Sequence, residues 1–223
     1  MRSLFWKEWR EGRANLLVGV LIVAVLSFVT LFFDVAPGAI LVSYAILILA
    51  GYFGAWSFSN EKSTLEFLLS VPVARKTIFL DKWLIGALNI LVLLVVALAI
   101  EIMIYQTNGF GRLANFKDAN FDFRGGLYPS YLWIVCKRLS QSLFGAVALY
   151  NITFLMSIVF DNALTALLWG GISAVAVGLV AWGIFGFVLH LQPATISAVT
   201  GIVVILGAFF LAYRIFSRKE VRV

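Results

Sequence analysis

Long apolar runs, separated by short clusters of charged residues, dominate the pattern along this chain. A membrane span needs about 20 mostly apolar residues. On this basis we predict six spans, at about 14–33, 36–59, 83–105, 139–160, 163–189 and 194–214. The last two come from one stretch without Asp, Glu, Lys or Arg, in which residues 190–193 provide the turn. Because the runs are continuous rather than alternating, they favour helices over a β-barrel.

The composition agrees with this pattern. The 223 residues are 62% hydrophobic and 13% charged, whereas soluble proteins are roughly half apolar and a quarter charged. A soluble chain of this length could not bury so much apolar surface, and disordered chains are poor in such residues. The single cysteine, Cys136, excludes an intramolecular disulfide and a multi-cysteine metal site. We therefore predict an all-α polytopic membrane protein, with residues 1–223 forming one transmembrane domain and no metal site.

The Lys and Arg residues divide unequally between the two sides of this topology. With six spans, both termini lie on one side, together with twelve basic residues: Arg2, Lys7, Arg10, Arg13, Lys62, Arg75, Lys76, Lys82, Arg214, Arg218, Lys219 and Arg222. The other side holds five: Arg112, Lys117, Arg124, Lys137 and Arg138. The positive-inside rule places both termini in the cytoplasm. We expect a multi-pass protein of a cell membrane, the cytoplasmic membrane of a prokaryote, and no nucleic-acid partner for the net charge of +6.

The first 13 residues combine bulky apolar and basic side chains. The residues that define this character are Phe5, Trp6, Lys7, Trp9 and Arg10. Such a composition predicts an amphipathic helix that lies in the cytoplasmic interface and contacts membrane lipid. The alternative is a basic anchor with no further role.

Residues 60–82 form a long cytoplasmic loop with its own helical pattern. Leu65, Leu68 and Leu69 recur at the spacing of one helix face, and Glu66 supplies an acid in the first turn. Pro72 disfavours helical geometry at the residue before it, so the helix should end there. This short surface helix has the shape to dock in a groove of a cytosolic partner. The alternative is that it lies on lipid headgroups.

This loop also carries a family resemblance. The residues concerned are Glu61, Thr64, Leu65, Glu66, Leu68, Leu69, Ser70, Pro72, Arg75, Ile78 and Lys82. Their pattern resembles the coupling-helix signature of type-2 permease subunits of ATP-binding-cassette exporters, and residues 4–9 resemble the elbow helix of that family. In many members, re-entrant helices lie between the last two spans, where this chain has only residues 190–193.

The resemblance implies that two copies, or this chain and a second permease subunit, pair with two ATPase subunits. The chain contains no Gly-Lys pair and thus no phosphate-binding loop. We therefore expect no enzyme activity and no cofactor on this chain, with ATP and Mg held by the partner subunit. A hydrophobic or amphipathic substrate (a peptide, a lipid or a drug-like molecule) is expected because the spans carry so few charges.

Two of the polar residues inside predicted spans are candidates for a functional or structural role. Glu101 lies about one turn from the outer end of its helix. Acidic residues inside the membrane are often functional. Glu101 therefore either interacts with a substrate or a proton, or forms a structural ion pair with Lys137 or Arg138. Asn151 lies in mid-span, where a polar contact between helices is expected.

Small residues form ridges on two spans. Gly51 and Ala55 lie on the second span, and Gly170, Ala174 and Gly178 lie on the fifth. Close helix contacts in lipid use such residues. The resemblance implies that these spans line a dimer interface and a central path, to which Tyr52 and Trp56 would contribute; packing within one subunit remains the alternative.

The outer loop, about 106–138, is rich in glycine and aromatic residues. It forms either a packed cap over the outer mouth or a flexible loop. Two other functions remain open at this stage: a membrane scaffold that recruits a cytosolic protein, and a carrier that uses Glu101 for protons.

Overall fold

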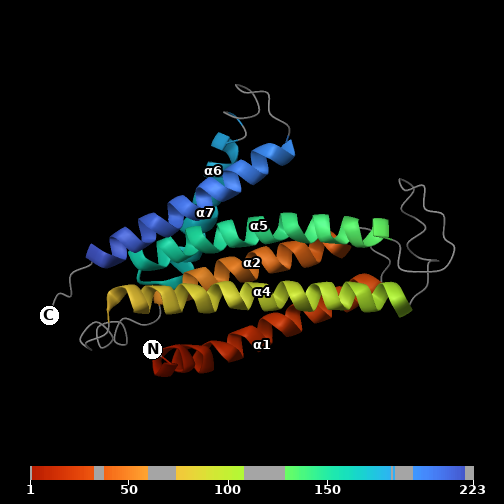
Figure 1. Ribbon diagram of the computed structural model, residues 1–223, viewed down its shortest axis with the longest axis horizontal. Helices are drawn as coiled ribbons and strands as arrows, with labels where there is room; N and C mark the ends of the chain where they lie inside the picture. The colour runs from red at the N-terminus through yellow and green to blue at the C-terminus, as the bar shows by residue number, and fades with distance from the viewer. Residues whose placement is uncertain are drawn as a thin grey trace.

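The computed structural model describes residues 2–32, 38–59, 74–107, 129–181, 183 and 193–218. Within these ranges the chain forms six α-helices and no β-strand (Figure 1). The helices are α1 (Arg2–Phe32), α2 (Gly38–Ser59), α4 (Arg75–Thr107), α5 (Pro129–Val159), α6 (Ala163–Ala181) and α7 (Pro193–Arg218). The all-helical prediction is confirmed for this part of the chain.

Among the described residues, three helical segments are long and apolar enough to cross a membrane: Arg75–Ile100, Ala163–Ala181 and Val199–Arg218. Three further apolar stretches are shorter: Gly12–Ser27, Val42–Phe58 and Leu143–Val159. Each lies in one of the remaining helices. The chain thus has the helices of a membrane protein, while the full set of six spans stays a prediction.

The helix bounds differ from the predicted spans in informative places. The basic residues before the third span belong to α4, which begins at Arg75 rather than at Trp83. Helix α5 begins at Pro129, because a proline at the first helical position loses no hydrogen bond. Helix α1 continues from Arg2 to Phe32, so the expected elbow helix of residues 1–13 is not confirmed as a separate element.

Helices α2 and α5 lie side by side and form the centre of the bundle (Figure 1). Helix α1 packs against α4 and α2, and α4 also contacts α5. Helices α6 and α7 pack on the α5 side, and the start of α7 projects away from α1, α2 and α4 on the side to which α6 also extends (Figure 1). The start of α1, the end of α7, the last turn of α2 and the first turn of α4 are at the same end of the bundle, which we call the terminal end.

The described part of the chain has a mainly apolar core with a few polar side chains in it, and large apolar side chains also cover its surface. The buried polar residues are Ser27, Lys82, Asn89, Asn151, Thr153 and Ser157. Large apolar side chains are exposed along α1, α6 and α7, for example Leu21, Leu179 and Phe210. A water-soluble monomer rarely exposes such extended apolar surfaces, whereas lipid tails accept them. This exposed apolar surface is compatible with a membrane protein.

A tight turn connects α5 to α6. The side-chain oxygen of Asn162 accepts a hydrogen bond from the backbone N–H of Leu164 at 2.9 Å, which is the geometry of an N-cap. The rings of Phe160 and Trp169 stack across this turn with their centroids 6.3 Å apart. The turn thereby fixes the direction in which α6 leaves the bundle.

Candidate functional site

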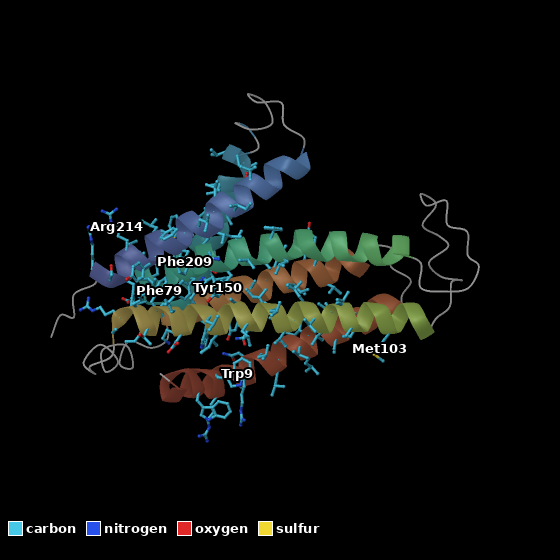
Figure 2. The ribbon with its side chains drawn as sticks, viewed as in Figure 1. Trp9, Phe79, Met103, Tyr150, Phe209 and Arg214 are labelled. Atoms are coloured by element: carbon cyan, nitrogen blue, oxygen red, sulfur yellow. The ribbon has the colours of Figure 1, made fainter. Side chains whose placement is uncertain are left out.

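Aromatic side chains from four helices meet at the terminal end. The cluster consists of Phe58 from α2, Phe79 from α4, Phe154 from α5, and Phe209 and Phe216 from α7, and we call it the end cluster. Phe79 is fully buried at its centre, 5.4 Å from the rings of both Phe154 and Phe209 (centroid to centroid), in edge-to-face geometry. Figure 2 shows Phe79 and Phe209 close to Tyr150 at this end. Aromatic pairs in this arrangement add about 0.5–1.5 kcal/mol each beyond their burial.

A buried lysine lies beside the end cluster. Lys82 on α4 is only 5% exposed, and its Nζ lies 5.4 Å from the centroid of the Phe58 ring. This is the distance of a cation–π contact. The sequence identifies Lys82 as part of the family pattern and as one of the basic residues that indicate the topology. Its position in the sequence does not predict that it is buried against α2.

Arg75 connects the start of α4 to the end of α7. Its Nη1 donates a hydrogen bond to the backbone carbonyl of Ser217 at 3.1 Å. The last four carbonyls of a helix have no partner within the helix, and a cation there also interacts favourably with the helix dipole. Among the residues predicted to couple to an ATPase, Arg75 is the one that the structure describes. The others, Glu61, Thr64, Leu65, Glu66, Leu68, Leu69, Ser70 and Pro72, lie outside the described residues.

A small polar network fastens α4 to α5. Trp83 Nε1 donates to Asn151 Oδ1 at 3.0 Å, and Asn151 Nδ2 donates to the carbonyl of Val147 at 2.8 Å. The hydroxyl of Tyr150 donates to the carbonyl of Trp83 at 2.9 Å. The hydrogen bond from Trp83 is the polar contact between helices that we expected for Asn151. The side chain of Glu101, the other polar candidate, lies outside the described residues.

The small residues of α2 pack inside the chain. A methyl group added to Gly51 would lie 3.1 Å from Leu167 Cδ1 on α6, and one added to Gly54 would overlap Thr153 on α5. Ala55 is also buried. Gly54, which the ridge of residues four apart did not include, marks the closest approach between α2 and α5. Its spacing of three residues from Gly51 is the sequence signal that could have identified it.

The small residues of α6 divide into two groups. Gly170 is buried against Thr153 on α5, whereas a methyl group added to Gly171 or Gly178 would meet no atom within 4 Å. Ala174 is partly buried. The start of this ridge therefore packs within the chain, and its end is open. A role of either ridge in a dimer interface stays a prediction.

The aromatic candidates occupy mixed environments. Tyr52 is partly buried beside Trp56, with ring centroids 5.4 Å apart, and Trp56 is exposed. In α1, Trp6 and Arg10 are exposed, while Trp9 packs against the core (Figure 2). The side chains of Phe5 and Lys7 lie outside the described residues.

No three His, Cys, Asp or Glu side chains come together as a metal site in the part of the chain that the structure describes. The described residues form a connection between helix ends. Ring contacts join the ends of α2, α4, α5 and α7, and the Arg75 hydrogen bond joins α4 to α7. A comparison of the sequence with models of known protein families found no match, and neither did a comparison with curated proteins.

Proposed function

We propose that this chain is the membrane-spanning subunit of an ATP-binding-cassette exporter. Two copies, or this chain and a second permease subunit, pair with two separate ATPase subunits that bind ATP and Mg. ATP-driven closure of the ATPase subunits switches the path between inward-facing and outward-facing states. The cargo is a hydrophobic or amphipathic molecule: a peptide, a lipid or a drug-like compound. The site of action is the cytoplasmic membrane of a prokaryotic cell.

The observation that carries this proposal is the pattern of residues 61–75 and its place in the chain. The pattern resembles a coupling helix, and it lies between α2 and α4. The adjoining ends of these two helices are at the terminal end, where α5 and α7 also end. A force applied by a cytosolic subunit at this end would therefore act on four helices at once.

The surface of the chain is compatible with the proposed assembly. Along α6, the open space beside Gly171 and Gly178 would let another helix approach closely. The exposed side chains of this helix are apolar, for example Val175 and Leu179. A lipid-like cargo, or a second copy in the membrane, fits such a surface better than an ion or a sugar does.

The proposal is tested by co-expression with the ATPase subunit encoded in a neighbouring reading frame. The complex is reconstituted in lipid vesicles, and two rates are measured: ATP hydrolysis and ATP-dependent movement of a fluorescent lipid analogue. Glu66→Lys and Leu68→Asp should each lower dye movement at least tenfold relative to ATP hydrolysis, while both variants still insert in the membrane. Lys76→Ala is the control, because Lys76 is exposed at the same end and lies outside the pattern.

The outcomes separate the competing functions. Normal coupling in both variants, or no ATPase subunit bound to the wild-type chain, would contradict the proposal. A cytosolic protein without ATPase activity as the bound partner would favour a scaffold. Dye movement that needs no ATP and is abolished by Glu101→Gln would favour a proton-coupled carrier.

A further inference from the structure

The first turns of α4 hold α7 through two successive contacts on one face. Arg75 donates to the carbonyl of Ser217. Phe79, four residues later, packs against α7 with its ring centroid 5.4 Å from that of Tyr213 and 5.9 Å from that of Phe216. Residues four apart lie on the same side of a helix. Arg75 and Phe79 therefore form one continuous attachment along the last two turns of α7.

Helix α2 reaches the same part of α7. The ring centroid of Phe58, in the last turn of α2, lies 5.1 Å from that of Phe216. The two helices that flank residues 60–73 thus both contact the last turns of α7, although α7 begins only at Pro193, far along the sequence from both. A displacement of the ends of α2 and α4 would therefore act on the last turns of α7.

The rest of α7 is held less firmly. Ile202, Val203 and Leu206 are exposed, and Gly207 has open space where a side chain would be. The start of the helix projects away from α1, α2 and α4 (Figure 1). A 26-residue helix is about 39 Å long at 1.5 Å per residue. A tilt of about 10° at the terminal end would therefore move the other end of α7 by about 7 Å.

We propose that the last two turns of α7 are the driven end of a lever, and that Arg75 is the positioning residue that transmits movement of the start of α4 to this lever. The inference rests on the proposed function, since it says how the force of the ATPase subunits enters the bundle. Arg75 then acts through the carbonyl of Ser217 and not as a contact to the ATPase subunit. Loss of the hydrogen bond removes the polar contact between the start of α4 and the end of α7, while the packing of α7 against α5 and the end cluster remains.

The test measures a distance between spin labels in the reconstituted complex with its ATPase subunit. One label is placed at Leu91 on α4 and one at Val203 on α7, both exposed, in a Cys136→Ser background. The distance is recorded by double electron–electron resonance without nucleotide and after trapping with ATP and vanadate. The compared variants are Arg75→Ala, Arg75→Lys and Lys76→Ala; the last removes the same charge from the neighbouring exposed position.

In the wild-type chain and in Lys76→Ala, trapping should shift the label distance by several ångströms. In Arg75→Ala the shift should fall by at least half while the ATPase subunit remains bound, and Arg75→Lys should recover part of it because lysine can still donate to the carbonyl. Phe216→Leu, which weakens the ring contacts and leaves Arg75 in place, should reduce the shift as well. A purely structural role of Arg75 would change the stability but not the nucleotide-dependent shift.

The failures are distinguishable. If trapping changes the label distance in Arg75→Ala as much as in the wild type, the proposed role of Arg75 in moving α7 is wrong, and the proposed function is unaffected. If Arg75→Ala no longer binds the ATPase subunit, Arg75 is a docking residue and the transmission role is wrong. If the wild-type chain binds no ATPase subunit, the proposed function fails and this inference fails with it.

Discussion

Replacement of Gly54 by alanine tests the close approach of α2 and α5. The added methyl group would overlap the side chain of Thr153 and would lie 2.6 Å from the carbonyl oxygen of Tyr150 and 2.9 Å from the backbone nitrogen of Phe154. An ordinary C···O contact is about 3.3 Å, so the two helix backbones must separate by about 0.7 Å. Because two of the three contacts are with backbone, no rotation of a side chain can relieve them.

The expected cost follows from this separation. A gap of about 0.5–1 Å removes a quarter to a half of the dispersion energy between the facing atoms, and overpacking of a core costs about 1–3 kcal/mol. Alanine gains about 1 kcal/mol over glycine in helix propensity. With the clash at the upper end of its range, Gly54→Ala should be destabilised by about 2 kcal/mol in total. For a chain of this size, that corresponds to a melting temperature lower by roughly 4–8 °C.

The assay is thermal unfolding of the purified chain in a lipid nanodisc, followed by the fluorescence of its tryptophans. Gly171→Ala is the matched control, because the same methyl group would meet no atom within 4 Å there. This control should unfold at the wild-type temperature or slightly above it. If Gly54→Ala unfolds at the temperature of Gly171→Ala, α2 and α5 do not cross as closely as described, and the account of the bundle centre is wrong.

Two further predictions concern the polar network and the topology. Trp83→Phe and Asn151→Leu should each lower the melting temperature. The double variant should reveal a coupling free energy of about 0.6–1.7 kcal/mol between the two sites, the size of a hydrogen bond between helices in lipid. If the two effects are additive, the hydrogen bond does not contribute to the stability of the bundle. In a Cys136→Ser background, a membrane-impermeant maleimide should label Lys76→Cys only from the cytoplasmic side and Gly126→Cys only from the opposite side. Labelling of both from one side would contradict the orientation derived from the basic residues.

The sequence predicts where the helices lie along the chain, but not which helices pack against one another. Each predicted span overlaps one helix of the structure, because an apolar run of this length has few alternatives to a helix in lipid. The bounds were less accurate at α4, where basic residues at 75–82 were assigned to the loop although they continue the helix. A charged residue at the end of a helix reaches the interface by extending its side chain, so charge alone does not mark the helix end.

The end cluster could not be derived from the sequence. Phe58, Phe79, Phe154 and Phe216 are far apart along the chain, and aromatic residues near the end of a span are equally typical of the membrane interface. Gly54 shows the same limit, since a spacing rule selects a face of one helix but does not say which helix packs against it. Asn151 was more predictable, because a buried amide in an apolar span needs a partner.

The two halves of the bundle respond differently to a force at the terminal end. The overpacking that separates α2 from α5 by less than 1 Å costs about 3 kcal/mol in the estimate for Gly54, before the gain in helix propensity. The hydrogen bond of Trp83 to Asn151 holds α4 on the same unit. The middle of α7 presents Ile202, Val203 and Leu206 to its surroundings, so a tilt of this helix exchanges one apolar neighbour for another at little cost. Under the proposed function, a force that enters through the ends of α2 and α4 would therefore be expressed as a movement of α7 and not as an opening between α2 and α5.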